Sequence, residues 1–213
     1  MTETPRSYSS LESDTKYSGE LKDGKKHGHG TLIFSDGTKY VGNFKDDLIH
    51  GHGTLFYEDG DVYVGGFVND TEHGHATYTW VNGDEYIGEH KDGSRSGLGI
   101  FRYADGTVYE GEFKDGNFDG KGEYTTPNGS KYIGEYKDGD RCGNGISTWV
   151  SGHKYEGEYK DNEFCGQGTF TFTDGSKVMG EWRNNEVNGY AVRYDPAGNI
   201  TQKGIYKDNK WLH

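Results

Sequence analysis

The sequence is poor in the residues that build an ordinary globular core. Its 213 residues include 3 prolines, 2 cysteines and only 35 leucine, isoleucine, valine and phenylalanine residues, about 16% of the chain. A share below roughly 20%, combined with a net charge of -12, is typical of intrinsic disorder. With so few branched aliphatic residues, the chain cannot build its core from them. The scarcity of cysteine is a separate point, and it favours a reducing, cytoplasmic location.

Further absences narrow the class of protein. No run of 18 apolar residues occurs, which excludes a transmembrane helix. The first residues lack the basic-then-apolar pattern of a secretory leader, so none is expected. A pI near 5.1 argues against nucleic acid as a partner and makes an anionic membrane surface less favourable, because the whole chain would be repelled.

Glycine and aromatic residues are abundant instead. The chain has 36 glycines, 17 tyrosines, 10 phenylalanines and 4 tryptophans. Disordered chains are poor in aromatic residues, so this content contradicts the first interpretation. We expect a core in which aromatic rings lie on glycine.

The aromatic and glycine residues follow a period of 23 residues. Tyrosines recur at this spacing, and a valine takes the eighth place: Tyr17, Tyr40, Tyr63, Tyr86, Tyr109, Tyr132, Tyr155 and Val178. Counting this residue as the first position, the third, twelfth and twenty-first positions are glycine in all eight units. With the eighth and fourteenth positions, they hold 34 of the 36 glycines. Fixed-period self-similarity of this kind indicates a repeat protein rather than a disordered one.

Each unit is predicted to form two β-strands. In the segment KYVGNF, the first, third and fifth positions of the unit alternate with polar or small residues, as a strand requires. Asp-Gly or Asn-Gly pairs such as Asp36-Gly37 and Asp59-Gly60 predict type I′ hairpin turns, and the Lys-Asp-Gly segment supplies the other connection. We expect an all-β fold, an elongated single-layer twisted antiparallel meander of stacked β-hairpins with 16 to 18 strands.

The unit resembles the MORN repeat, whose pattern is Y-x-G-x-aromatic followed by G-x-G and a D/N-G turn. The runs YIGEYKDGDRCGNG and YEGEYKDNEFCGQG match it closely. We predict an unordered segment at residues 1–14, a repeat array at 15–198 and a C-terminal cap or half-repeat at 199–213. The resemblance implies a non-catalytic scaffold; similar arrays serve in ciliary radial spokes, membrane junctions and cytoskeletal complexes, and phosphoinositide binding has been suggested for some members.

The aromatic columns are the main candidate for a binding site. A single-layer sheet cannot cover this face with its own chain, so some rings should be available to an extended or helical segment of a partner protein, or to a second copy in a homodimer. The alternative for any one ring is that it belongs to the core. The candidate groove comprises Tyr63, Phe67, Tyr78, Trp80, Tyr86, Phe101, Tyr103, Tyr109, Phe113, Tyr124, Tyr132, Tyr136 and Trp149.

A histidine ladder is a second candidate. The eleventh and thirteenth positions of the first three units hold His27 and His29, His50 and His52, and His73 and His75. Residues i and i+2 of a strand share a face, so each pair could bind a zinc-like ion; the alternative is a solvated edge. The two cysteines, two strands apart at the eleventh position, are predicted to be free thiols.

Nothing in the sequence predicts an enzyme. The chain contains no G-x-S-x-G, H-E-x-x-H or phosphate-binding loop motif, and no cofactor is expected. Glutamates recur at the fourth position and lysines at the sixth, in identical surroundings that do not suit an acid and base pair. We interpret them as a solvated outer face. The lysine column leaves phosphoinositide or membrane-surface binding as an alternative to the protein scaffold.

Overall fold

The computed structural model describes residues 15–212, which form strands and turns and contain no helix. None of these residues therefore belongs to a helix that could cross a bilayer. The disorder predicted for residues 1–14 lies outside the described residues. The strands are β1 (Lys16–Lys22), β2 (Lys25–Ile33), β3 (Lys39–Lys45), β4 (Leu48–Phe56), β5 (Val62–Val68), β6 (Thr71–Thr79), β7 (Glu85–Lys91), β8 (Ser94–Arg102), β9 (Val108–Lys114), β10 (Asn117–Thr125), β11 (Lys131–Lys137), β12 (Asp140–Thr148), β13 (Lys154–Lys160), β14 (Glu163–Thr171), β15 (Lys177–Arg183), β16 (Glu186–Tyr194), β17 (Ile200–Lys207) and β18 (Lys210–Leu212).

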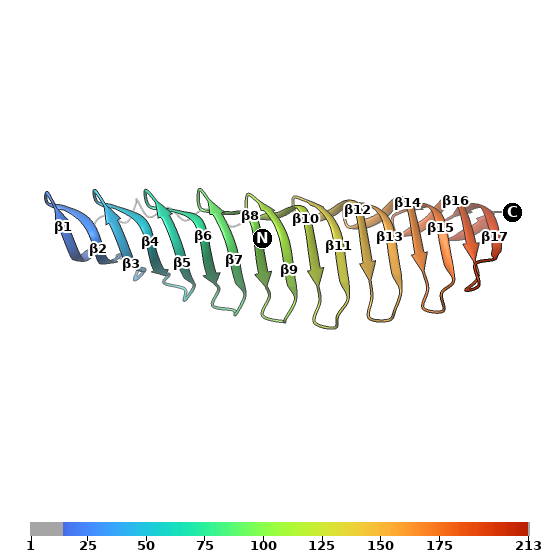
Figure 1. Ribbon diagram of the computed structural model, residues 1–213, viewed down its shortest axis with the longest axis horizontal. Helices are drawn as coiled ribbons and strands as arrows, with labels where there is room; N and C mark the ends of the chain where they lie inside the picture. Colours follow the sequence, from blue (N-terminus) through green and yellow to red (C-terminus); the bar gives the residue numbers. More distant parts are fainter. Residues whose placement is uncertain (1–14, 213) are drawn as a thin grey trace. The chain divides into compact units, whose positions relative to one another are not determined.

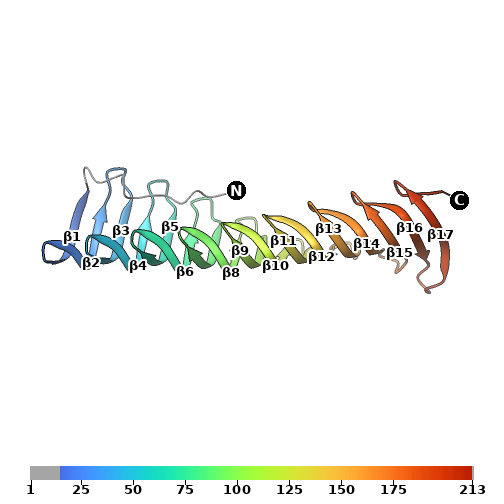
Figure 2. The same cartoon turned by 90° about the horizontal axis from the view of Figure 1, so that it is seen from above.

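The strands pair antiparallel with their neighbours in the chain and belong to one 18-stranded sheet, which confirms the predicted all-β meander. Two compact units divide the described residues: an N-terminal unit of residues 15–106 and 112–117, and a C-terminal unit of residues 107–111 and 118–212. Within each unit the hairpins follow one another in chain order as a single layer (Figures 1 and 2). The 23-residue repeat thus corresponds to a seven-residue strand followed by a nine-residue strand.

The tyrosine at the first position lies across two glycines, as the sequence predicts. Tyr86 pairs with Phe101 across β7 and β8, and its ring covers Gly88 and Gly99. A Cβ atom added at Gly99 would lie 2.5 Å from Tyr86 Cε2, which is too close for any side chain. The Tyr86 hydroxyl donates to the carbonyl of Glu89 at 2.9 Å. The same packing on two glycines recurs under Tyr17, Tyr40, Tyr109, Tyr132 and Tyr155, whereas Tyr63 lies beside Gly65 and Ala76; these rings build the core from aromatic side chains.

The turns differ from the prediction. Only the glycine of the Asp-Gly and Asn-Gly pairs has positive φ, for example +96° at Gly37, and the Phe34 amide donates to the Thr38 carbonyl across a three-residue loop. Residues with positive φ at both central positions, as a type I′ turn requires, lie instead at the seventh and eighth positions, such as Asp46 (φ 51°) and Asp47 (φ 73°). Both connections, the Asp-Gly or Asn-Gly loop and the turn at the seventh and eighth positions, carry Asp, Asn and Gly. The prediction from residue type therefore placed the type I′ turn at the wrong connection.

The glutamate column also has a role that the sequence interpretation missed. Gly88 pairs with Gly99 and Glu89 with Ser96, which leaves the two residues at the twelfth and thirteenth positions in a bulge. The carboxylate at the fourth position fills this bulge: Glu158 Oε1 accepts from the amide of Gln167 at 2.7 Å. It lies where a Cβ at the twelfth position would be, and that position has positive φ, so glycine is required there.

Successive units are joined at the eighth position. Its amide donates to the carbonyl of the tenth position in the preceding unit, as from Asn162 to Arg141 at 3.1 Å. Where the eighth residue is Asp or Asn, its side chain also accepts from the amide of that tenth residue, at 2.9 Å between Asn162 and Arg141 and at 2.8 Å between Asn209 and Val187. Asn209 lies between β17 and β18, within the predicted cap.

Candidate functional site

Most of the predicted groove residues are buried rather than exposed. Nine of the thirteen belong to the core, with exposed fractions between 0% and 7%: Tyr63, Phe67, Tyr78, Tyr86, Phe101, Tyr109, Phe113, Tyr132 and Tyr136. The other four are half-buried: Trp80 and Tyr103 in the N-terminal unit, and Tyr124 and Trp149 in the C-terminal unit. The rings therefore cover one another, and only this second group offers ring surface to a partner.

The structure adds a column that sequence reasoning missed, at the tenth position. Its side chains point toward the ring-bearing face, and they range from fully buried, as at Ile49, which is 1% exposed, to half-buried, as at Phe118 and Arg141. Two of them are arginines, Arg95 and Arg141. The variable residue type hid this column in the sequence. The signal that could have found it is the alternation of the strand, since the tenth residue lies opposite the fifth.

Arg95 is enclosed by aromatic rings in the N-terminal unit. It is 8% exposed, and its Nη2 donates to the carbonyl of Gly116 at 2.7 Å. Cation–π contacts of this kind are favourable, and more so when they are desolvated. The guanidinium carbon lies between 5.1 and 5.8 Å from the centroids of four rings, those of Phe101, Trp80, Tyr86 and Phe113.

Arg141 occupies the equivalent place in the C-terminal unit, 46 residues or two repeats later. Its Nη2 donates to the carbonyl of Asn162 at 2.9 Å, as that of Arg95 does to Gly116. Its guanidinium carbon lies 5.4 Å from the rings of Tyr132 and Tyr159, which correspond to Tyr86 and Phe113. The two remaining rings have no counterpart, because Thr126 stands where Trp80 does and Ser147 where Phe101 does.

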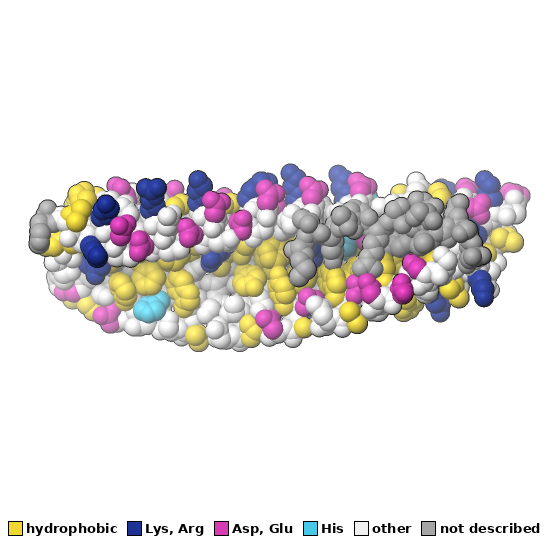
Figure 3. All heavy atoms as spheres, turned by 180° about the vertical axis from the view of Figure 1, so that it is seen from behind, with side chains coloured by type: hydrophobic (Ala, Val, Ile, Leu, Met, Phe, Trp, Pro, Cys, Tyr) yellow, Lys and Arg dark blue, Asp and Glu magenta, His cyan; other side chains and the backbone are white. Residues whose placement is uncertain are grey.

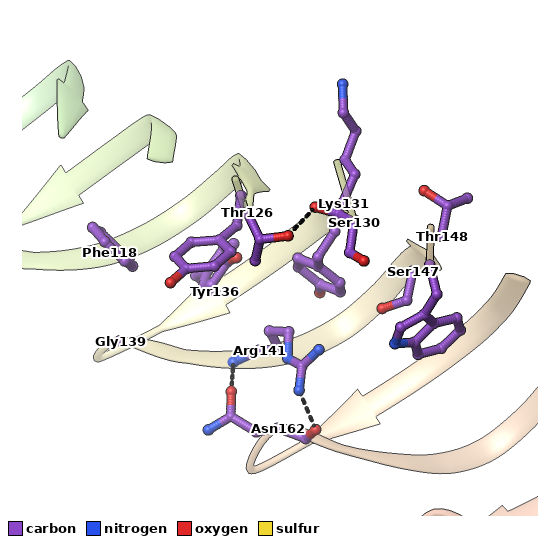
Figure 4. Close-up of a pocket in the computed structure, with 13 residues that line it drawn as sticks. Phe118, Thr126, Ser130, Lys131, Tyr136, Gly139, Arg141, Ser147, Thr148 and Asn162 are labelled. Carbon is purple, nitrogen blue, oxygen red and sulfur yellow. Dashed lines mark hydrogen bonds between the residues drawn. The ribbon is translucent and has the colours of Figure 1, made fainter. Parts of the chain in front are cut away.

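A pocket of about 330 Å³ lies beside Arg141 where those rings are missing. Figure 4 shows Arg141 bonded to Asn162 on one side, with Thr126 and Ser147 above it and Lys131 pointing away. The lining also includes the half-buried rings of Tyr124 and Trp149. We call this the Arg141 pocket; its remaining lining residues are Phe118, Ser130, Tyr132, Tyr136, Gly139 and Thr148. All of them belong to the C-terminal unit.

The chemistry of the Arg141 pocket suits binding. Burial raises the pKa of Tyr132 and of Tyr136 well above the usual value for a phenol, so both hydroxyls stay protonated at neutral pH. The Tyr159 hydroxyl donates to Ser147 Oγ at 2.7 Å, and Lys131 Nζ lies 2.5 Å from Glu123 Oε1. Among the described residues no ion pair is made by Arg141. The pocket thus offers one guanidinium, aromatic rings and neutral hydroxyls.

The histidine ladder does not converge. His27, His50 and His73 are half-buried, whereas His29, His52 and His75 are exposed, because the bulge at the twelfth position interrupts the alternation. Within residues 15–212 no three His, Cys, Asp or Glu side chains are placed so that they could hold a metal ion. Cys142 and Cys165 are free thiols, as predicted.

The lysine column is interleaved with acidic residues. Lys137 Nζ lies 2.7 Å from Asp119 Oδ2 and 4.0 Å from Asp138 Oδ1. Figure 3 shows basic and acidic side chains alternating along the upper rim, with hydrophobic side chains in the hollow below it on the left, where the C-terminal unit lies. On the face shown in Figure 3, the described lysines are thus interleaved with acidic side chains rather than gathered into a patch, an arrangement that does not favour an anionic membrane surface.

Comparison with known proteins concerns the repeat and the fold. Searching curated proteins gave no match. Similar solved structures include the TCP domain of SAS-4 (dCPAP) of Drosophila melanogaster in complex with a proline-rich motif of Ana2 (dSTIL), with a TM-score of 0.44, 17% identity and coverage of 84% of this chain and 89% of that one. The wild-type TCP10 domain of Danio rerio CPAP gives a TM-score of 0.41 and 13% identity, with coverage of 84% and 89%. Both TM-scores are below 0.5, so these likenesses carry no inference about the function of this protein.

The family comparison covers nearly the whole described chain. The MORN repeat matches eight consecutive segments: 17–39, 40–62, 63–85, 86–108, 109–131, 132–154, 155–177 and 179–200. These boundaries follow the tyrosine period and correspond to the pairs of strands from β1 to β16. The chain belongs to the MORN repeat family.

Proposed function

We propose that this protein is a non-catalytic scaffold that binds a segment of a partner protein on the aromatic face of its sheet. The observation that carries the proposal is the Arg141 pocket, where the ring columns are interrupted and half-buried rings stand beside a guanidinium. Protein interfaces are enriched in such residues, and truncation of Trp, Tyr and Arg costs most of the affinity at them. The repeat supplies a rigid surface on which such a segment can lie.

Co-purification with matched variants tests this function. The tagged chain and the double variant Tyr124→Ala/Trp149→Ala are each used to recover proteins from native cells, and a recovered candidate is then purified and titrated directly. We expect the double variant to weaken direct binding at least tenfold. Ile133→Ser is the matched control, because Ile133 is 48% exposed and follows the core residue Tyr132, so it lies on the other face of β11. Equal loss in the control, or no loss in the double variant, would contradict binding at the aromatic face.

We propose a cytoplasmic setting for the scaffold, in a cytoskeletal or ciliary assembly, because MORN arrays serve in such complexes. Fluorescent tagging of the full chain in ciliated cells measures its distribution, and we expect enrichment along the axoneme or the cortex. A uniform distribution of both the wild type and the Tyr124→Ala/Trp149→Ala variant would contradict this location. Two copies joined as a homodimer would be detected by analytical ultracentrifugation.

A further inference from the structure

We propose that the Arg141 pocket binds an aromatic side chain of the partner segment, which takes the place that Trp80 and Phe101 occupy beside Arg95. The inference rests on the proposed function and names the chemistry of the partner. Its basis is internal: the same site occurs twice in the chain, once filled by the protein's own rings and once open.

The two sites share the same backbone frame. Tyr86 pairs with Phe101 across β7 and β8, and Tyr132 pairs with Ser147 across β11 and β12. Each arginine donates through Nη2 to the carbonyl of the residue 21 positions later, at 2.7 Å for Arg95 and 2.9 Å for Arg141. The guanidinium groups are therefore held in the same way in both.

The two sites differ in what covers the guanidinium. In the N-terminal unit the centroids of Trp80 and Phe101 lie 5.1 Å apart with a tilt of 39°, and both rings are within cation–π distance of Arg95. In the C-terminal unit Thr126 and Ser147 leave that space as part of the pocket of about 330 Å³. Small-molecule sites begin at about 300 Å³, so the space accepts a ring of the size of indole.

An aromatic ring suits this space better than an aliphatic side chain. Both would displace water from apolar walls, but only the ring offers a negative π-face to the guanidinium. Because one terminal nitrogen of Arg141 is already bonded to Asn162, the orientation of the guanidinium is fixed before a ligand arrives. A tryptophan side chain is therefore expected to bind about threefold or more tightly than a leucine side chain.

The first experiment uses small probes on the full-length protein. N-acetyl-tryptophanamide, N-acetyl-leucinamide and N-acetylglycine are titrated while the NMR signals of the Arg141 Nε–H and Trp149 Nε1–H groups are followed. Both signals should shift saturably with the tryptophan probe and much less with the other two. Equal shifts with leucinamide would overturn the preference for a ring. Equal shifts with N-acetylglycine would assign the site to a carboxylate and overturn the inference as well.

The second experiment fills the pocket from within. Thr126→Trp/Ser147→Phe reproduces the pair of rings at Arg95, so it should abolish binding of the tryptophan probe and leave the strand signals of β11 and β12 in place. Ser147→Phe alone serves if the double variant does not fold. Unchanged probe binding in the folded filled variant would overturn the inference.

The filled variant also separates this inference from the proposed function. A partner that binds the filled variant as tightly as the wild type would leave the scaffold intact and overturn the aromatic pocket. Loss of both partner and probe would support both. If the tryptophan probe binds the Arg141 pocket but no protein binds the aromatic face, the result supports the pocket and contradicts the scaffold function.

Discussion

Arg95 and Arg141 lie at the same position of two repeats, yet one is buried beneath four rings and the other borders an open pocket. The backbone frame, the arginine and its carbonyl acceptor are common to both sites. The difference comes from two residues in the ring columns, Thr126 and Ser147. In a repeat protein, a pocket can thus arise by omission: smaller side chains in two successive units, Thr126 in one and Ser147 in the next, open the space beside an arginine that rings cover at the equivalent N-terminal site.

The largest expected effect comes from emptying the filled site. Trp80→Thr/Phe101→Ser should lower the local stability of β7 and β8 by about 4 kcal/mol, because loss of a buried Phe or Trp ring costs about 3 to 5 kcal/mol. Amide hydrogen exchange of these strands measures it. The reciprocal Thr126→Trp/Ser147→Phe should destabilise β11 and β12 by about 1 to 3 kcal/mol, because it adds ring volume and removes the Ser147 acceptor of the Tyr159 hydroxyl. Similar losses in both would show that the two sites are not equivalent.

Removing each arginine should have unequal effects. Arg95→Ala is expected to cost about 3 kcal/mol, because it leaves a cavity beneath Trp80 and Phe101 and removes a charged hydrogen bond. Arg141→Ala should cost less than about 1 kcal/mol, because water already reaches that side chain. Urea unfolding followed by circular dichroism compares the two variants. An equal cost would mean that the rings above Arg95 add nothing to its contribution.

The two sites should also respond differently to acid. His90, which is 4% exposed between Tyr63 and Tyr86, lies opposite Arg95, and burial together with the charges of Arg95 and His75 lowers its pKa from an ordinary value near 6.5 to about 4. The folded protein therefore binds this proton less well than the unfolded chain. The free energy of unfolding therefore has its full value above pH 6.5, where His90 is neutral in both states, and it decreases as the pH falls from 6.5 toward 4.

His90→Phe tests that dependence. Phenylalanine occupies the same position in other units, as Phe44 and Phe67, so the core should accept it. Between pH 8 and pH 5 the wild type should lose about 2 kcal/mol more than the variant. The C-terminal counterpart is Tyr136, whose raised pKa keeps it neutral throughout this range, so Tyr136→Phe should show no such difference. Parallel pH profiles of wild type and His90→Phe would refute the assignment.

The smallest effect concerns the eighth position. Asn162 accepts a hydrogen bond from the Arg141 amide, whereas Gly116 has no side chain to do so for Arg95. Both residues have positive φ, +69° and +82°, a conformation that asparagine tolerates. Gly116→Asn should therefore stabilise the protein by about 1 kcal/mol and Asn162→Gly should destabilise it by a similar amount. Thermal unfolding measures the change in Tm of each variant. Changes of the same sign in both variants would contradict this prediction.

Sequence alone predicted the parts of the fold that repeat identically. The tyrosine period gave the strands, and glycine at the third and fourteenth positions predicted the ring-on-glycine core, because only a missing Cβ leaves room for Tyr86 above Gly88 and Gly99. The turn types were assigned wrongly, because Asp-Gly pairs occur at both connections and loop length, not composition, decides between them. The carboxylate in the bulge was missed, since its partner is a backbone amide that no residue letter reveals.

The candidate site follows from differences between the units, whereas the fold follows from what the units share. The aromatic columns were found by what the units share, but the Arg141 pocket depends on where two successive units depart from the others. Trp149 and Tyr124 were named for the right face, whereas the tenth-position arginine was not, because its column has no common residue type. Which rings remain accessible depends on how neighbours cover them, and this follows from packing rather than from the periodic pattern.

The link at the eighth position gives the array a direction. Each connection reaches back and closes the preceding unit, and Asn209 does so for Val187 of the eighth. For this hydrogen bond, each unit therefore depends on the unit that follows it and not on the unit before it. Duplicating a whole 23-residue unit inside the array would leave every such bond intact, so the length of the binding face could change by recombination without redesign. Deleting residues from Asn209 onward would instead open the last complete hairpin, so growth and shortening of this protein are not symmetrical events.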